Sequence, residues 1–273
     1  MIFQYEIQDA QIFKSHSAGN ADDENFEKNE RILKNLHYEY AEINANVPTI
    51  VLLHGWGGNY QSFLPIYSAF DGYNILSLDF CGFGESDKPN PNFTIFSYAE
   101  IVASLLKHLN LTNVILVGHS FGGRVALILS ESNKEIVKKL ILIDSAGIKP
   151  RFSVKKALKI FRYKFNKKLV VHNLRNVKCL EKFGSADYKM LSNDEKIVFS
   201  RVIKEDLSGF AKKIEKETLI LWGENDKDTP LYMAKKLHKY IKSSKLFVVK
   251  STEHFSYLDN PQIVIKIIKE FLE

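Results

Sequence analysis

Residues 114–122 read Val-Ile-Leu-Val-Gly-His-Ser-Phe-Gly, and this stretch decides the fold. Its four apolar residues, three of them β-branched, predict a short buried strand. The G-x-S-x-G pattern that follows predicts a sharp turn into a helix. Ser120 needs small neighbours there, because the backbone of such a turn is strained and the hydroxyl must stand clear of it. Gly118 and Gly122 supply them, so Ser120 is a candidate nucleophile.

Apolar runs on both sides of this unit repeat the same alternation of strand and helix. Strands are expected at 49–53, 74–79, 113–117, 140–144, 218–222 and 245–249. Helices are expected between and after them, at 60–70, 95–109, 122–132, 231–240 and 261–272. Continuous apolar strands separated by helices are typical of strands covered on both faces. The sequence therefore predicts an α/β fold with a mostly parallel sheet flanked by helices.

One connection is much longer than the others. The strands at 140–144 and 218–222 are separated by residues 145–217, which include the 72 residues 146–217, whereas a parallel crossover needs about a dozen. The surplus predicts an inserted helical cap at 146–217, on a core formed by 1–145 and 218–273. At the start of the chain, 1–13 and 33–43 are expected to form an antiparallel edge hairpin around a polar loop at 22–30.

The positive charge is concentrated in the predicted cap. The chain has 38 Lys and Arg against 32 Asp and Glu, and residues 149–178 contain 11 basic residues and no acidic one. Such a stretch raises the local concentration of anionic partners. A solvated outer helix face is the ordinary interpretation of such a charge run, but aromatic and aliphatic residues lie between the charges, which keeps a docking surface or a membrane-facing helix as an alternative. Nucleic acid is not expected, because no recognition motif accompanies the charge.

Composition restricts the class of protein further. The chain has 273 residues, of which 45% are hydrophobic, enough to bury a large core and too many for a disordered chain. Cys81 and Cys179 form neither a disulfide framework nor a paired metal motif. We find no secretory signal and no apolar run that could span a bilayer. A cytoplasmic protein is the resulting expectation.

A second glycine-rich turn follows the first core strand. Residues 54–58 read His-Gly-Trp-Gly-Gly, and this H-G-x-G pattern lets a backbone N–H approach a substrate oxygen. His54, Gly55 and Gly57 are read as the structural part of this motif. The oxyanion hole is assigned to the backbone N–H groups of Trp56 and Phe121, the second of which opens the helix after Ser120.

The general base and its orienting acid must come from later strand ends. His254 lies between the last predicted strand and the last helix, and it is the candidate base. The loop after strand 218–222 contains Asp226, which we prefer as the acid, and Asp228 as second choice; Asp144 is a third. His119 is expected to pack or hydrogen-bond locally. The chain order serine, acid, histidine suits a serine on a strand-to-helix turn of such a sheet.

From about residue 49 to 272 the chain resembles the α/β-hydrolase family, especially its capped bacterial esterase-like members. The two glycine turns, the acid loop and the histidine loop carry this resemblance. The segment 79–86 also looks like the family's D-x-x-G-x-G-x-S loop, with Asp79 bracing the turn and Cys81 where members often have Pro or Arg. The resemblance implies a serine hydrolase that cleaves a carboxylic ester or thioester of a small or acyl-chain substrate through an acyl-enzyme, with Asp226 and His254 completing the triad of Ser120.

The resemblance leaves several other functions open. Ser120 argues against the dehalogenases and epoxide hydrolases of the family, which use an aspartate at that position. A perhydrolase side activity is compatible with the serine machinery, and the resemblance implies no metal or organic cofactor. The basic segment and the H-G-W-G turn resemble esterases that act on methyl esters of an acidic acyl-carrier protein. Hydrolases of the C–C bond in ring-fission products usually carry a cap arginine, for which Arg162, Arg175 and Arg201 are candidates. A ligand-binding receptor on a hydrolase scaffold is the non-enzyme alternative.

Overall fold

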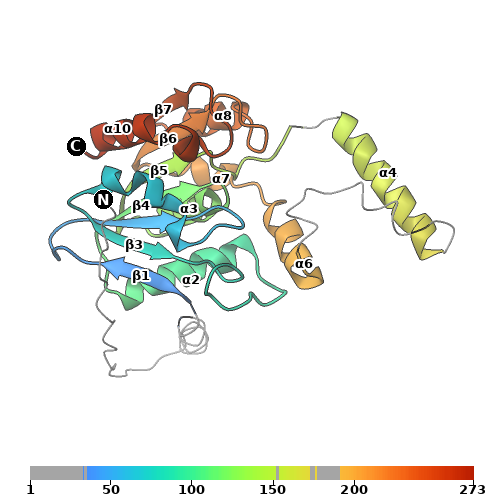
Figure 1. Ribbon diagram of the computed structural model, residues 1–273, viewed down its shortest axis with the longest axis horizontal. Helices are drawn as coiled ribbons and strands as arrows, with labels where there is room; N and C mark the ends of the chain where they lie inside the picture. The colour runs from blue at the N-terminus through green and yellow to red at the C-terminus, as the bar shows by residue number, and fades with distance from the viewer. Residues whose placement is uncertain (1–32, 34–35, 152–153, 173–175, 177–190) are drawn as a thin grey trace.

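A seven-stranded sheet forms the centre of the molecule (Figure 1), in the order β1-β3-β2-β4-β5-β6-β7. The computed structural model describes residues 33, 36–151, 154–172, 176 and 191–273. β1 is antiparallel to β3, and the other neighbouring strands are parallel, which confirms the predicted fold class. The strands are β1 Tyr38–Ala41, β2 Thr49–Leu53, β3 Asn74–Leu78, β4 Val114–His119, β5 Val137–Ile143, β6 Glu217–Gly223 and β7 Ser244–Val249.

Helices cover both faces of the sheet because its central strands are apolar on both sides. In β2, Val51 and Leu53 pack into one core cluster, whereas Ile50 and Leu52 pack into the other. This alternation follows from the period of two in a strand. The first cluster contains buried residues of α2 (Ile95–His108), α3 (Phe121–Ser132) and α8 (Tyr232–Tyr240). The second contains those of η1 (Tyr60–Phe70) and α10 (Pro261–Leu272).

The sheet has a topological switch point between β2 and β4, because the chain adds strands on one side of β2 first and on the other side afterwards. The two glycine turns follow these two strands. β3 pairs with one side of β2, and β4 pairs with the other. In open α/β sheets, ligands bind outside the carboxyl ends of the strands at such a switch point. The topology therefore brings the ends of β2 and β4 together at one edge, with β5, β6 and β7 following in order.

Three elements differ from the sequence-based expectations. The helix expected at 60–70 is a 3₁₀ helix that contains Pro65, which has no N–H to donate to an α-helical bond. β5 begins at Val137, three residues before its expected start. A short helix, α9 (Ser256–Asp259), precedes α10. Of the expected N-terminal hairpin, β1 lies at the sheet edge on β3, whereas 1–13 and 22–30 lie outside the described residues.

Buried Asp79 braces the loop after β3, the role the sequence suggested for it. Its Oδ1 accepts a hydrogen bond from the Tyr60 N–H (2.6 Å), and its Oδ2 accepts one from the Glu85 N–H (2.9 Å). The same Oδ2 lies 2.9 Å from His37 Nδ1. These bonds tie the 79–86 loop to η1 and to the residues before β1.

The residues between β5 and β6, 144–216, contain α4 (Val154–Val171), α6 (Asn193–Val202) and α7 (Ser208–Ala211). We refer to 146–217 as the insertion. Figure 1 shows α4 well apart from the sheet and its flanking helices, with α6 between them. Cys179 and Arg175 lie outside the described residues. No helix in the described part of the chain is long and apolar enough to cross a membrane.

α6 is anchored on the core by its side chains. Val198 and Val202 are each 1% exposed. The Arg201 guanidinium donates hydrogen bonds to the carbonyls of Pro91 and Phe93, both at 2.9 Å. From the core side, buried Arg124 of α3 donates to the Glu205 carbonyl at 3.0 Å. The C-terminal arm of the insertion is therefore held at the edge of the sheet where the glycine turns lie.

Candidate active site

Ser120 occupies a strained position between β4 and α3. Its φ of 48° lies in the left-handed region, which a non-glycine residue rarely adopts. The turn is also crowded, because a Cβ at Gly118 would lie 2.7 Å from the Gly122 carbonyl oxygen. A Cβ at Gly122 would overlap the carbonyl oxygen of Leu53 at the end of β2. Glycine is therefore required on both sides of Ser120, as the G-x-S-x-G pattern predicted.

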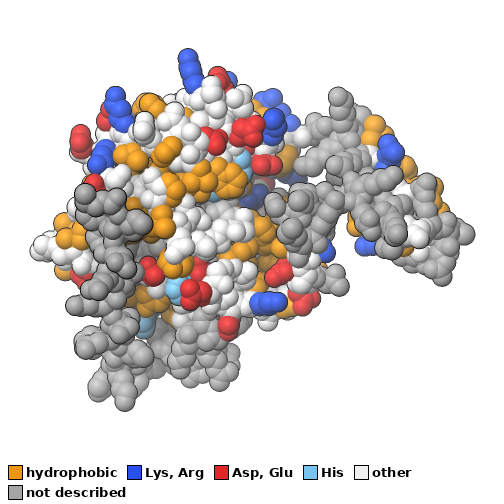
Figure 2. Space-filling view, viewed as in Figure 1, with side chains coloured by type: hydrophobic (Ala, Val, Ile, Leu, Met, Phe, Trp, Pro, Cys, Tyr) orange, Lys and Arg blue, Asp and Glu red, His pale blue; other side chains and the backbone are white. Residues whose placement is uncertain are grey.

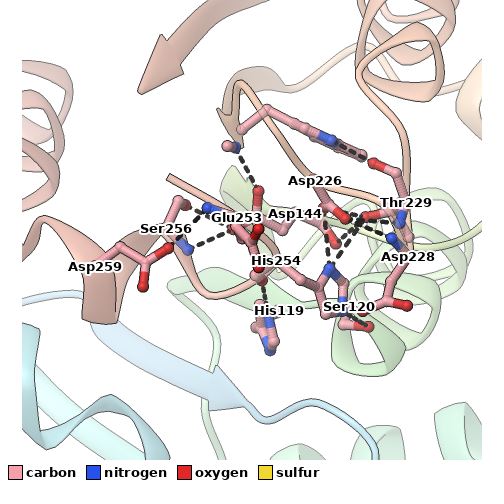
Figure 3. Close-up of polar contacts among 12 residues, drawn as sticks. His119, Ser120, Asp144, Asp226, Asp228, Thr229, Glu253, His254, Ser256 and Asp259 are labelled. Atoms are coloured by element: carbon pink, nitrogen blue, oxygen red, sulfur yellow. Dashed lines mark hydrogen bonds and ion pairs between the residues drawn. The ribbon is translucent and has the colours of Figure 1, made fainter. Parts of the chain in front are cut away.

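His254 lies between Ser120 and Asp226, as Figure 3 shows. Its Nε2 is 2.9 Å from Ser120 Oγ, and its Nδ1 is 2.9 Å from Asp226 Oδ2. The three residues come from the ends of β4 and β6 and from the loop that follows β7. The structure thus brings together three residues that are widely separated in sequence, within hydrogen-bonding distance of one another.

Asp226 is held by its own loop as well as by His254. Its Oδ1 accepts hydrogen bonds from the backbone N–H groups of Asp228 (2.8 Å) and Thr229 (2.9 Å). Thr229 Oγ1 lies 2.6 Å from Asp226 Oδ2. Asp228, the second-choice acid, is exposed. Sequence reasoning missed Thr229; its place three residues after the acid is the signal that suggests a side-chain-to-backbone turn.

The electrostatics of the pair favour the charged form of both partners. Burial alone would lower the pKa of His254, but the hydrogen bond and charge of Asp226 outweigh it, so the pKa is raised. Burial would raise the pKa of Asp226, but hydrogen bonds from His254 and Thr229 outweigh it, and the pKa is lowered. An imidazole with a raised pKa is a stronger base, and Asp226 stabilises the imidazolium that forms when a proton arrives.

Asp144, the third-choice acid, does not contact His254; it joins the loops around the pair. Its Oδ1 accepts a hydrogen bond from the Gly223 N–H (2.6 Å), and its Oδ2 accepts from the N–H (3.0 Å) and Oγ (2.6 Å) of Ser256. Gly223 starts the loop of Asp226, and Ser256 follows His254 by two residues. Burial raises the pKa of Asp144 to about 7, although the hydrogen bonds from Ser256 and Gly223 oppose this.

The ring of His119 holds the backbone of His254 in place. His119 Nε2 lies 2.9 Å from the His254 carbonyl oxygen. Burial, followed by the charge of His254, lowers the pKa of His119 to about 3, so the ring is neutral and its Nε2–H donates. The sequence led us to expect a local partner, but this bond spans 135 residues. No sequence pattern relates two residues so far apart.

The turn after β2 is fixed by the ring of His54. Burial lowers the pKa of His54 to about 4, which keeps the imidazole neutral. Its Nδ1 lies 2.7 Å from the Gly55 carbonyl oxygen, and its Nε2 accepts a hydrogen bond from the Phe80 N–H at 3.0 Å. Gly57 has a φ of 81°, a conformation that glycine adopts without strain. These contacts hold Trp56, the residue between the two glycines, at the edge of the sheet.

Aromatic rings gather around Trp56. Its ring packs edge-on against Phe121 (centroids 5.4 Å apart) and Phe83 (4.9 Å) from the core. From the insertion, Phe199 of α6 packs against the same ring at 4.8 Å. The two residues assigned to the oxyanion hole are thus neighbours in space, at an apolar wall that α6 helps to form.

The candidate acid–base pair also offers ligand atoms of a kind that metals bind. One ligand atom each from Asp226, Asp228 and His254 lie within 4.8 Å of one another. However, Asp226 Oδ2 and His254 Nδ1 are hydrogen-bonded to each other, and the same Oδ2 receives Thr229 Oγ1. The set fits an acid–base pair better than a cation site, and the absence of a metal requirement stays a prediction.

Comparison with known proteins agrees with this fold. Residues 48–169 match the family model of the alpha/beta hydrolase fold, and residues 200–273 match that of TAP-like proteins. A solved esterase from Exiguobacterium antarcticum superimposes with a TM-score of 0.68 at 24% identity, covering 87% of this chain and 96% of that chain. The chain belongs to the α/β-hydrolase family of enzymes.

Two relatives in sequence span nearly the whole chain. Hydrolase YugF of Bacillus subtilis is 29% identical over 262 residues, which cover 88% of this chain and 94% of the relative. The 2-hydroxy-6-oxo-6-(2'-aminophenyl)hexa-2,4-dienoic acid hydrolase of Metapseudomonas resinovorans is 26% identical, covering 85% of this chain and 86% of the relative. The similarity therefore includes the insertion as well as the sheet.

Proposed function

We propose that the protein is a serine hydrolase that cleaves a carboxylic ester or thioester through an acyl-enzyme. The observation that carries this proposal is the continuous hydrogen-bonded path from Ser120 Oγ through His254 to Asp226. Ser120 is the nucleophile, His254 the general base, and Asp226 the residue that orients the imidazole. Such a triad is recognised by its geometry and roles rather than by sequence position.

In the first half of the reaction, Ser120 Oγ attacks the carbonyl carbon of the substrate while its proton moves to His254 Nε2. The tetrahedral intermediate collapses, the bond to the leaving group breaks, and His254 returns the proton to the departing oxygen or sulfur. Asp226 accepts the His254 Nδ1–H throughout and stabilises the imidazolium. In the second half, water attacks the carbonyl carbon of the acyl-enzyme while one of its protons moves to His254. The second tetrahedral intermediate then collapses, the bond to Ser120 Oγ breaks as His254 returns the proton to that oxygen, and the carboxylic acid is released.

The negative charge on the intermediate's oxygen requires donors near Ser120. We assign this role to the backbone N–H groups of Trp56 and Phe121. Phe121 is the first residue of α3, where backbone N–H groups lack an intrahelical acceptor. His54 and Gly57 fix the turn that carries Trp56. One such donor contributes about 3 kcal/mol to transition-state stabilisation.

The insertion supplies the substrate side of this proposal. We infer that 146–217 acts as a cap over a core of 1–145 and 218–273, because Phe199 reaches the ring of Trp56 beside the nucleophile turn. A small or acyl-chain ester would then lie between this arm and the sheet. The basic stretch at 149–178 would attract an anionic partner, and we keep a cytoplasmic location as part of the proposal.

The test is a panel of p-nitrophenyl esters of increasing acyl length, assayed with the parent protein and with Ser120→Ala. We expect turnover of at least one ester by the parent and a fall of about 10⁶ in kcat for the variant. Ser145→Ala, at a buried serine just beyond Asp144, is the matched control and should retain activity. Equal turnover by the parent and Ser120→Ala would remove the proposal.

A second candidate function is hydrolysis of a C–C bond in ring-fission products, which the name of the Metapseudomonas resinovorans relative favours. Among the arginines considered for binding such a substrate's carboxylate, Arg201 donates to two backbone carbonyls. Arg162 is exposed on α4. Neither observation favours binding of a substrate carboxylate by these arginines, so we rank ester hydrolysis first. Direct assay with a 2-hydroxy-6-oxo-dienoate distinguishes the two.

A further inference from the structure

Helix α4 presents large apolar side chains on one of its faces. Leu158, Phe161 and Phe165 are 56%, 66% and 55% exposed. Their spacing of three and four residues places them on one side of the helix. Isolated exposed apolar residues are ordinary, but a contiguous stripe marks an interaction surface. We call these three residues the apolar stripe of α4.

The charge on α4 has a single sign. Its 18 residues contain seven Lys and Arg and no Asp or Glu. At 100° per residue, Arg162 and Lys168 border the apolar stripe on opposite sides, and Lys164 and Lys167 lie further round; all four are exposed. In Figure 2, orange and blue side chains both occur on the described part of α4. Long basic side chains bordering an apolar face can extend their charges toward head groups while their stems cover apolar surface.

Among the described helices of the insertion, α6 contrasts with α4. α6 buries Val198 and Val202 against the core and is tied to it by Arg201. α4 stands apart from the sheet in Figure 1. The same insertion thus has one helix that faces the core and one whose apolar stripe faces outward, where a partner can reach it.

We propose that α4 docks on an anionic lipid surface, lying in the plane of the interface with its apolar stripe inserted and its Lys and Arg on the head groups. Complementarity of charge selects this partner, because an all-basic helix gains about 1 kcal/mol for each Lys or Arg near an anionic membrane. The apolar stripe selects lipid over a purely electrostatic protein contact, since an interfacial helix needs both features. With seven charges in 18 residues, α4 cannot span the bilayer.

The experiment measures binding to sedimented vesicles, using the full chain with Ser120→Ala so that binding is read without turnover. Vesicles contain equal parts phosphatidylglycerol and phosphatidylcholine, or phosphatidylcholine alone, in low and high salt. We expect binding to the anionic vesicles only, weakened by salt. Because no substrate is hydrolysed, failure here leaves the proposed ester hydrolysis untouched, and failure of that hydrolysis leaves this binding untouched.

Two α4 variants and one control separate the contributions. Phe161→Ser with Phe165→Ser should lower vesicle affinity about tenfold or more, because the apolar insertion is lost. Lys164→Gln with Lys167→Gln should lower it about fivefold for each lysine removed. The control, Leu64→Ser with Ile263→Ser, changes apolar residues that are 52% and 43% exposed on the core, and it should bind like the parent.

Four results would overturn the proposal. The first is no preference for anionic vesicles. The second is a Phe161→Ser/Phe165→Ser variant that binds vesicles as the parent does. The third is binding of the parent to an acidic acyl-carrier protein but not to vesicles, which would assign α4 to a protein partner. The fourth is a parent that binds no vesicles while Phe161→Ser with Phe165→Ser changes its rate of hydrolysis of a soluble ester. That result would assign the apolar stripe to the entrance of the active site.

Discussion

At the carboxyl edge of the sheet, the side chains of Asp226, His254 and Asp144 are nearly enclosed, and each is fixed by hydrogen bonds that come from several strand ends. Along α4, by contrast, the apolar stripe is exposed, and so are the basic residues whose side chains the structure describes: Arg162, Lys164, Lys167 and Lys168. The difference separates two tasks. A site that transfers protons requires groups held in one geometry, whereas a docking surface requires accessible area and charge. Substitutions at the carboxyl edge of the sheet should therefore change the rate of hydrolysis. Substitutions on α4 should change only the binding of the protein to a lipid surface.

The largest effect is expected for the nucleophile. Ser120→Ala removes the attacking oxygen while leaving a small residue at the strained turn, and we expect kcat to fall by about 10⁶. Steady-state hydrolysis of the best p-nitrophenyl ester measures this, with circular dichroism to show that the fold is retained. A fall of less than tenfold would mean that another group performs the attack.

The orienting acid comes next. Asp226→Asn keeps the shape of the side chain but loses the charge that stabilises the His254 imidazolium, and we expect kcat to fall by about 10⁴. Asp228→Asn is the matched control, because Asp228 is exposed in the same loop; its kcat should stay near that of the parent. The assignment of the acid is wrong if the two variants exchange these outcomes.

Asp144→Asn tests whether joining the two loops matters for the site. Asparagine offers one acceptor oxygen where Asp144 bonds both Gly223 and Ser256, so at least one buried donor loses its partner. We expect kcat/KM to fall by about 10², the cost of misplacing a catalytic group by about 1 Å. Unchanged kcat/KM in a folded variant would show that the loops hold their positions without it.

The pH dependence follows from the raised pKa of His254. A general base must be unprotonated, so kcat/KM should fall as pH decreases through that pKa, and the acidic limb should lie above pH 6.5, the ordinary value for histidine. In Asp226→Asn, burial remains while the charge is lost, so the limb should move to lower pH. If the acidic limb does not move in this variant, the group that titrates there is not one whose pKa depends on Asp226.

The smallest effect is expected on α4. Lys164→Gln with Lys167→Gln changes only exposed side chains, so its rate on a soluble ester should stay within about twofold of the parent. The measurement is kcat/KM without vesicles. A loss of tenfold or more would show that α4 contributes to the site itself and would weaken the contrast between the two regions.

The sheet could be predicted from the sequence because its strands are short apolar runs. The two turns at the site could be predicted because each needs glycine for a steric reason and so leaves a recognisable pattern. Ser120 and His254 were singled out by their places after strands. The sequence ranked Asp226 ahead of Asp228 and Asp144, although all three follow strand ends, and in the structure it is Asp226 that contacts the imidazole. The hydrogen bond from His119 to the His254 carbonyl could not be predicted, since it joins residues 135 apart and long-range contacts leave no periodic signal. Thr229 did leave a local signal, its place three residues after Asp226, which the sequence analysis did not use. The apolar spacing over 60–70 predicted a helix but did not distinguish the 3₁₀ form that η1 adopts.

The most direct test of the central claim is covalent labelling with a fluorophosphonate, followed by mass spectrometry of the digested protein. If His254 activates Ser120, the label should be found on Ser120, in one equivalent per chain, and labelling should be lost in His254→Ala although the serine is still present. Label on any other residue, or equal labelling of the parent and His254→Ala, would contradict an activated serine at this edge of the sheet.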